Sequence, residues 1–321
     1  MNPVWADELK RRYLRGESSQ FVLHGNVHDL VLHGGKLHDL VDYLGRELLA
    51  PSKDVVLEYN LSSGVRFIKK EAQIDGLEEL FLPRSPDKVL PALEKLLLTT
   101  NRVAVIVSYA EMIAPAADVS FSTETDRQSV ITLHRWSLSP ILEKSDNVVV
   151  LLTENLSELH TKLVGNPRTA TLEIGMPDEA ARAEVIAHVA PSADAKWRQR
   201  LAEVTAGLKA VQLKALLEPH AEIPDDPKAL EAREQYIVTL LANAPNAAAR
   251  AKKMAQLTAG MSHDEIRELV APGVTAKVDN DEQEQLLRLI YKRKREIIER
   301  ECFGLIEFVQ SNHDFSVVGG I

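Results

Sequence analysis

Short apolar runs alternate with amphipathic segments along the first half of the chain. The longest runs are continuously apolar, which is typical of strands covered on both faces of a parallel sheet. Segments with helical spacing lie between them, at 37–49, 86–99 and 124–143. This order predicts an α/β core with right-handed crossovers. Its five-stranded parallel sheet is expected at 21–23, 54–59, 103–107, 148–152 and 170–174, with a hairpin return at 65–68.

The pattern changes near residue 177, where the strand-like runs stop. From Asp178 to about residue 300, the spacing of apolar positions predicts helices and short turns. Asp178 is expected to cap the first of these helices. The buried face of that helix is predicted to hold Ala181, Val185, Ile186 and Val189.

The helical part contains an internal repeat with an offset of about fifty residues. Val-Thr-Ala-Gly-Leu at 204–208 is echoed by Leu-Thr-Ala-Gly-Met at 257–261. Upstream, the Ala-Arg pair at 181–182 is echoed at 232–233. Two interpretations are open: a duplicated helical unit, which the extent of the match favours, or two unrelated helices that share a Thr-Ala-Gly turn.

The chain therefore divides into a core at 1–176, a helical part at 177–280 and a last segment at 281–321. A helix is expected over 281–302, and four basic residues at 292–295 interrupt its apolar stripe. Such a run forms a solvated face, which the flanking glutamates favour, or a local patch for phosphate or a partner. The ending Phe-Ser-Val-Val-Gly-Gly-Ile has no helix or strand after it and is expected to lead toward a further module.

Composition narrows the class of protein. With 45% hydrophobic and 26% charged residues, the chain is not a disordered protein. A net charge of −9 argues against broad nucleic-acid binding, and no apolar run is long enough to span a membrane. The N-terminus lacks the pattern of a signal peptide. The single cysteine, Cys302, excludes an internal disulfide, so a cytoplasmic location is expected.

Several short motifs follow one another in order. The first strand and its loop read Phe-Val-Leu-His-Gly-Asn-Val-His at 21–28. The strand at 103–107 is followed by Ser-Tyr-Ala-Glu, and the strand at 148–152 by Thr-Glu-Asn. Asn-Pro-Arg precedes the last strand, and Met-Pro-Asp leads into the helical part. Together these motifs resemble an AAA+ ATPase, and within that class the degenerate first module of bacterial and plastid tandem AAA+ ATPases.

The resemblance implies roles for three residues. Glu111 lies near the Walker B position, Asn155 at the sensor-1 position, and Arg168 where such proteins carry an arginine near the subunit boundary. As an arginine finger, Arg168 would reach a neighbouring subunit's nucleotide. The alternative is a surface arginine paired with Glu154 or Glu158.

The phosphate loop departs from the family pattern. Such a loop needs Gly-x-x-x-x-Gly-Lys-Ser/Thr, whose backbone N–H groups wrap the phosphates. The candidate cofactor-binding residues are Gly25, Asn26, Gly35 and Lys36, but Leu30 replaces the first glycine of the motif and Leu37 the hydroxyl residue. Asp29 would add negative charge near the phosphate. No Asp-Glu pair follows the strand at 103–107, so hydrolysis of ATP is not expected, although ATP or ADP with Mg²⁺ is the cofactor that the family implies.

Other polar residues invite weaker hypotheses. Histidines at 24, 28, 33 and 38 are expected to span a strand end, a loop and a helix start, so they share no face on which to bind a metal. Thr153, Asn155 and Ser157 are expected to be helix caps.

The sequence thus predicts a catalytically degenerate AAA+ module. Its expected partners are like modules in a ring, six by analogy with the family, or an active AAA+ ATPase in the same chain or on another one. The protein substrate is not identified by the sequence. Two alternatives remain: an active ATPase with an unconventional phosphate loop at 25–36, and a monomeric adaptor that binds another protein through its acidic helical half.

Overall fold

The computed structural model describes residues 2–72, 78–118, 120–191, 193–217, 227–241 and 247–258, with a few single positions between 266 and 299. The chain packs as two units. The first comprises Met1–Met176 with Lys209–Val211, and the second Pro177–Leu208 with Gln212–Ile321. No helix among the described residues is both long and apolar enough to cross a membrane.

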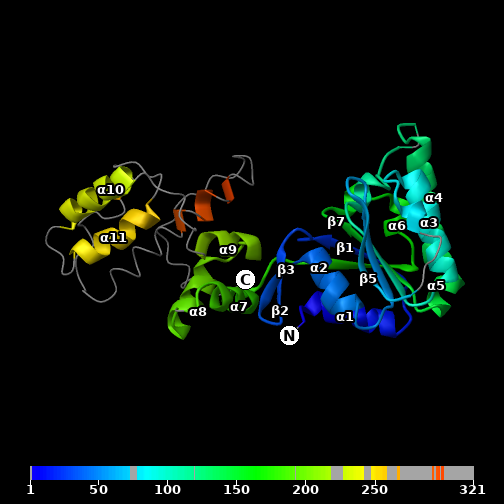
Figure 1. The fold of residues 1–321 in the computed structure, drawn as a ribbon, viewed down its shortest axis with the longest axis horizontal. Helices are drawn as coiled ribbons and strands as arrows, with labels where there is room; N and C mark the ends of the chain where they lie inside the picture. Colours follow the sequence, from blue (N-terminus) through cyan, green and yellow to red (C-terminus); the bar gives the residue numbers. More distant parts are fainter. Residues whose placement is uncertain are drawn as a thin grey trace, which may run out of the picture. The chain divides into compact units, whose positions relative to one another are not determined.

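The first unit is built on a six-stranded sheet with the order β5-β4-β6-β7-β1-β8 (Figure 1). Five strands are parallel, as predicted, because continuous apolar runs suit a sheet covered on both sides. The predicted hairpin return forms the antiparallel edge strand β5. The strands are β1 (Gln20–Gly25), β4 (Val55–Asn60), β5 (Gly64–Lys70), β6 (Val103–Val107), β7 (Val148–Thr153) and β8 (Thr169–Ile174).

Helices cover both faces of the sheet, and alternate strand residues serve each face. Val105 packs into the core on one side, and Ala104 and Ile106 into the core on the other. The first core is closed by α3 (Pro86–Thr99), α4 (Glu124–Leu138), α5 (Pro140–Lys144) and α6 (Thr161–Val164). The second is closed by α1 (Val4–Leu14), α2 (Leu40–Asp42) and η1 (Tyr43–Leu49). Short 3-10 turns complete the unit: η2 (Glu78–Phe81), η3 (Ala110–Met112) and η4 (Leu156–Glu158).

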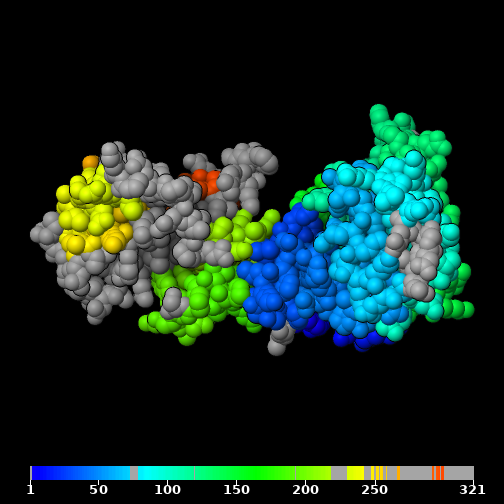
Figure 2. All heavy atoms as spheres, in the orientation of Figure 1, coloured from blue at the N-terminus to red at the C-terminus, as the bar shows by residue number. Residues whose placement is uncertain are grey.

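Two predicted helices differ from the structure. The helix expected over 37–49 is wrong at its start, because β3 (Lys36–Asp39) pairs with β2 (Leu30–His33) as an antiparallel hairpin. The β2–β3 hairpin and the edge strand β5, both in shades of blue, form part of the surface of the first unit (Figure 2). The helix expected over 124–143 is interrupted at Ser139, because Pro140 lacks an N–H group and disfavours a helical residue before it.

The second unit is helical in its described part. Its helices are α7 (Glu179–Val189), α8 (Ala195–Val204), α9 (Ala210–Leu217), α10 (Pro227–Leu240) and α11 (Ala247–Leu257), and the first two residues of α9 belong to the first unit. Asp178 caps α7, as predicted, by accepting the N–H of Ala181 at 2.8 Å. Val185 and Ile186 are buried, whereas Ala181 and Val189 are only half-buried. Arg182 is also buried, which the apolar pattern does not predict.

The sequence repeat coincides with a repeat of hydrogen bonds. Thr205 Oγ1 donates to the oxygen of Leu201 at 2.6 Å, and Thr258 Oγ1 donates to that of Met254 at 2.8 Å. Both threonines are fully buried at the end of a helix. Of the helix expected over 281–302, only a few positions between 291 and 299 are described, and these are helical; the rest of 281–321 lies outside the described residues.

Candidate functional site

A small crevice of about 140 Å³ opens at the carboxyl ends of β1, β4, β6 and β7. This edge is where open α/β sheets bind their ligands. The crevice is lined by residues from the loop after β1, from α2, from β4 and β7, and from the segments that follow β6 and β7: Val27, His28, Val41, Glu58, Ser108, Tyr109, Glu111, Leu152, Thr153 and Glu154.

Glu58 anchors one wall of the crevice. Its Oε1 accepts the hydroxyl of Ser108 at 2.8 Å, and its Oε2 pairs with Arg66 at 2.9 Å. Arg66 also pairs with Asp42 at 3.1 Å. Burial alone would lower the pKa of Arg66, but the bonds to these two carboxylates raise it. Glu58 was not among the predicted site residues, and the signal for it is a carboxylate inside an otherwise apolar strand.

Glu111, the predicted Walker B residue, lies in η3 and also lines the crevice. It is 9% exposed, and its Oε2 is buried without a hydrogen-bond partner among the described residues. Nearby, the ring of His28 stacks on Tyr109 at 5.2 Å, and His28 Nε2 lies 3.4 Å from Glu154 Oε1. Three carboxylates therefore face a space that would have to accept a triphosphate, which is electrostatically unfavourable.

At the end of β1 and in the loop after it, backbone N–H groups donate hydrogen bonds to backbone oxygens of the protein itself. The N–H of Gly25 donates to Glu154 O at 2.9 Å, and that of Asn26 to Ile174 O at 2.8 Å. The N–H of Val27 donates to Gly25 O, also at 2.8 Å. Gly25 has a φ of +93°, and a Cβ there would lie 2.8 Å from Ile174 O, so only glycine fits. These N–H groups are the ones that a phosphate loop would have to leave free.

Asn26 and Asp29 are bonded to the protein itself. Asn26 Nδ2 donates to Asp29 Oδ2 at 2.7 Å. The buried carboxylate of Asp29 also accepts the N–H groups of Ala210 at 2.9 Å and of Val211 at 2.8 Å, within the first unit. These two residues begin α9, and the first N–H groups of a helix form an anion site. Here the anion is a side chain of the same chain.

Gly35 and Lys36 lie at the tip of the β2–β3 hairpin. Gly34 and Gly35 have φ values of +57° and +74°, as a tight two-residue hairpin turn requires. Lys36 is exposed at the start of β3. The phosphate loop at 25–36, the alternative that the sequence left open, stays a prediction. In the structure Gly25 ends β1, Gly35 lies in the turn of the β2–β3 hairpin, and Lys36 begins β3.

Asn155 lies after β7 but does not line the crevice. Its Nδ2 donates to Glu158 Oε1 at 3.1 Å, and Thr153 Oγ1 donates to the backbone oxygen of Asn155 at 3.2 Å. Neither side chain accepts a backbone N–H from any residue that the structure describes, and the element that follows is only the 3-10 turn η4. The expectation that Thr153 and Asn155 cap a helix is therefore wrong.

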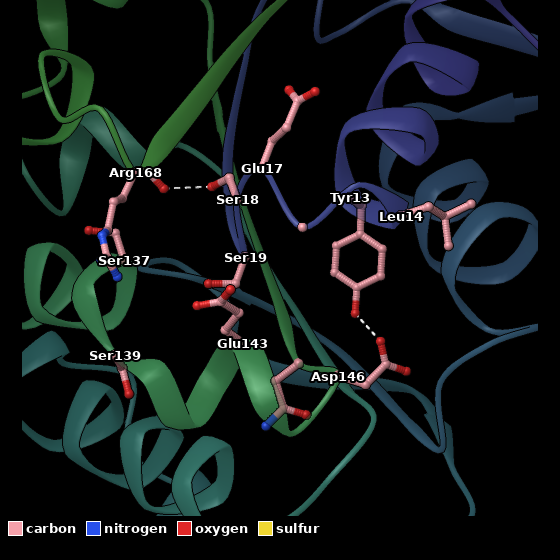
Figure 3. A pocket seen from close by; sticks show the side chains of 12 residues that line it. Tyr13, Leu14, Glu17, Ser18, Ser19, Ser137, Ser139, Glu143, Asp146 and Arg168 are labelled. Carbon is pink, nitrogen blue, oxygen red and sulfur yellow. Dashed lines mark hydrogen bonds between the residues drawn. The ribbon is translucent and has the colours of Figure 1, made fainter.

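Arg168 lies at the opposite edge of the sheet, immediately before β8. It lines a second, larger cavity of about 410 Å³ at the amino ends of β1, β7 and β8 (Figure 3). The structure therefore does not bring Arg168 together with Glu111 or Asn155. Pairing of Arg168 with Glu154 or Glu158 is also absent, since Arg168 forms no ion pair within the described part of the chain.

The predicted histidines do not converge. His24 lies in β1, His28 in the following loop, His33 in β2 and His38 in β3, so His38 is on a strand and not at a helix start. His33 packs its ring against Tyr43 at 5.3 Å. Among the residues that the structure describes, no three histidine, cysteine or acidic side chains are grouped so that they could hold a metal ion.

Comparison with known proteins adds one match. Residues 1–175 match the family model described as AAA+ chaperone, N-terminal Rossmann-like domain. The matched segment is more than half of the 321 residues and covers the sheet with both of its helical layers. No curated protein matches the chain.

Proposed function

Because the chain belongs to the AAA+ chaperone family through its N-terminal Rossmann-like domain, we propose that it is a catalytically degenerate AAA+ module. In this proposal the module supports or regulates an active ATPase module, carried by the same chain or by another one, within a ring of like modules. The absence of hydrolysis and the ring role are both our proposals, since the family match extends only to the domain itself.

The observation that carries the proposal is the hydrogen bonding of the loop after β1. Gly25, Asn26 and Val27 donate their N–H groups to oxygens of the chain itself. A phosphate loop works by presenting such groups to the ligand, so these bonds would have to break before a phosphate could bind. Breaking a backbone hydrogen bond in a buried site costs about 1–3 kcal/mol for each group left unpaired.

The charge of the crevice supports the same conclusion. Glu58, Glu111 and Glu154 line it, and Arg66, which pairs with Glu58, is also bonded to a second carboxylate, that of Asp42. In a P-loop ATPase, a lysine and Mg²⁺ offset the charge of the phosphates. Among the described lining residues there is no lysine or arginine to do so.

The supporting role rests on architecture. The six-stranded core retains both helical layers, and the second unit repeats the same buried threonine contact at Thr205 and Thr258. We infer that the fold serves this module without the phosphate chemistry, as expected of a part that packs beside like modules. A single cysteine fits a reducing compartment, so we also propose a cytoplasmic location.

Nucleotide titration tests the proposal directly. ATP and ADP with Mg²⁺ are titrated into the protein by calorimetry, and phosphate release is assayed on the same sample. We expect no saturable binding up to about 1 mM and no turnover. Lys36→Ala should change neither result. Tight binding with turnover that disappears in Lys36→Ala would contradict the proposal and favour an unconventional phosphate loop.

The ring role needs a separate measurement. Sedimentation velocity at increasing protein concentration should reveal assemblies larger than a monomer, alone or with an active AAA+ ATPase. Removal of 281–321 should then change the rate of that ATPase. A monomer at every concentration, with a partner rate unaffected by the truncation, would instead favour the adaptor hypothesis.

A further inference from the structure

One carboxylate oxygen at the carboxyl-edge crevice has no partner in the fold. Glu111 lines the crevice and is only 9% exposed. Among the described residues, no group donates a hydrogen bond to its buried Oε2. Nearly all buried polar atoms of folded proteins have a partner, because leaving one unpaired costs free energy. This oxygen therefore points to a ligand of the crevice that donates hydrogen bonds.

The other polar groups of the lining are mostly acceptors. Ser108 Oγ donates to Glu58 Oε1 at 2.8 Å, and Thr153 Oγ1 donates to a backbone oxygen at 3.2 Å, so both hydroxyl hydrogens are used within the fold. Glu154 is exposed, and its Oε1 lies 3.4 Å from His28 Nε2. Among the described lining residues, only His28 could carry a positive charge. The crevice is therefore built to accept hydrogen bonds from a cation.

The rest of the lining suits the apolar part of an organic cation. Val27, Val41 and Leu152 are apolar, and the half-exposed ring of Tyr109 stacks on His28 at 5.2 Å. Aromatic faces attract cations, and apolar side chains pack against the methylene groups of long basic molecules. The volume of about 140 Å³ is well below the roughly 300–1,000 Å³ of sites that enclose a whole small molecule. The crevice therefore fits one end of a longer ligand.

We propose that the crevice binds a primary alkylammonium group, carried by a free polyamine or by a lysine side chain of another protein. Glu58, Glu111 and Glu154 come from three segments: β4, η3 and the residues after β7. An ammonium group has three diverging N–H donors, whereas a planar guanidinium matches a single carboxylate best. Glu58 already pairs with Arg66 at 2.9 Å, so the attraction comes mainly from the other two carboxylates.

A metal ion fits the crevice less well. Within the described part of the chain, no three histidine, cysteine or acidic side chains are grouped closely enough to hold one. The inference rests on the proposed function, because the ammonium group would lie where an active module binds phosphate.

Ligand-observed saturation-transfer NMR on the full chain tests the inference, with Nα-acetyl-lysine methylamide, n-butylammonium and spermidine as probes. Calorimetry then gives their affinities. The norleucine analogue and the Nε-acetylated form of the lysine probe lack the charge and should bind at least about tenfold more weakly. Spermidine that binds more tightly than the lysine probe would identify a free polyamine as the ligand. The reverse order would identify a lysine side chain.

Glu111→Gln and Glu154→Gln should each weaken the lysine probe by about tenfold or more, because each removes one charged acceptor. Glu154 is exposed, so its variant should fold normally. Glu111→Gln should not lower the melting temperature, since no donor in the described chain loses its acceptor at Oε2. Glu143→Gln is the matched control, because it removes an exposed carboxylate that does not line the crevice.

No saturable binding of the three ammonium probes up to about 10 mM would overturn the inference. Equal binding of the uncharged analogues would also overturn it, as would an affinity that neither Glu111→Gln nor Glu154→Gln changes. These outcomes would leave the proposed function intact as long as ATP does not bind. ATP with Mg²⁺ that binds and displaces the lysine probe would instead contradict the proposed function.

Discussion

Arg182 donates its Nε–H to the backbone oxygen of Ala202 at 3.0 Å, and Arg233 repeats this contact by donating to Ala255 at 3.2 Å. Arg182 is almost fully buried and also donates to Pro177 O at 2.7 Å. The two arginines are equivalent positions of the sequence repeat, and so are the two alanines. At matching positions of the repeat, an arginine donates a hydrogen bond to a backbone oxygen near the end of a helix. This agreement supports the interpretation that the helical unit is duplicated.

Arg182→Met should loosen α7 and α8 locally. The methionine fills much of the volume but leaves the oxygens of Ala202 and Pro177 without their donors, at a cost of about 1–3 kcal/mol. Hydrogen exchange followed by mass spectrometry should report faster exchange in α7 and α8. Arg200→Met, at an exposed position of α8, is the control, and an equal effect there would contradict the explanation.

Gly25→Ala should destabilise the first unit by about 1–3 kcal/mol, because alanine is strained at a φ of +93°. Its Cβ would also approach Ile174 O to 2.8 Å. Gly175→Ala, next to Ile174, meets no atom within 4 Å and should have little effect. Urea unfolding compares the two variants. Similar stabilities would show that the path after β1 is less constrained than the contacts of Gly25 imply.

Asp29→Ala should expose the N–H groups of Ala210 and Val211 to solvent. Both lose their acceptor, as does the amide of Asn26, with a loss of stability of about 1–3 kcal/mol. Amide exchange at 210 and 211, measured by NMR, should accelerate in this variant. Asp39→Ala removes a carboxylate that makes no capping bond and is the control. Unchanged protection at 210 and 211 would rule out Asp29 as their acceptor.

The free energy of unfolding of the first unit should decrease at low pH, because Asp146 becomes protonated. Burial alone would raise the pKa of Asp146, but the bonds from Tyr13 and Lys53 lower it below its ordinary value of 3.8. A carboxyl whose pKa is lower in the folded state than in the unfolded state stabilises the fold at pH values above 3.8. That contribution is lost as the pH falls through the lower pKa of the folded state. Urea unfolding between about pH 7 and pH 2 should therefore give wild-type and Asp146→Asn curves that converge at low pH.

Asp39→Asn is the control for this pH series, because Asp39 is exposed. Its free energy of unfolding, plotted against pH, should run parallel to that of the wild type. A gap between wild type and Asp146→Asn that stays constant down to the lowest pH would show that the Asp146 charge does not contribute.

The sequence predicted the sheet well because its strands are short, continuously apolar runs, as at Val103–Val107. Few other segments of the chain have this pattern. The hairpin was missed because Gly35-Lys36 resembles part of a phosphate motif, although Gly34-Gly35 is equally a turn signal. The helix α1 was missed because only Ala6 and Leu9 of its residues are fully buried, which leaves a weak helical period.

The candidate site was predictable only where a local motif marks it. Glu111 comes after the buried strand β6 and Thr153 ends the buried strand β7, so their place at the carboxyl edge follows from the order of elements. The contact of Asp29 with Ala210 joins positions far apart in the sequence, and no local pattern indicates it. The cavity around Arg168 likewise joins residues that are far apart in the sequence, from 13–19, 137–147 and 168, and no local pattern indicates it.

The path of the main chain after β1 has a consequence for engineering nucleotide binding into this module. A lost catalytic side chain can return by one codon change, but here the main chain itself follows another route, with the tight turn at Gly34-Gly35 and the donors of Gly25 and Asn26 bonded to their own sheet. If the module binds no nucleotide, as proposed above, a change of one residue would not give it a phosphate loop, because the turn and these hydrogen bonds would both have to change. Under that proposal, random mutagenesis of the full module should yield no ATP-binding variants that carry a single substitution.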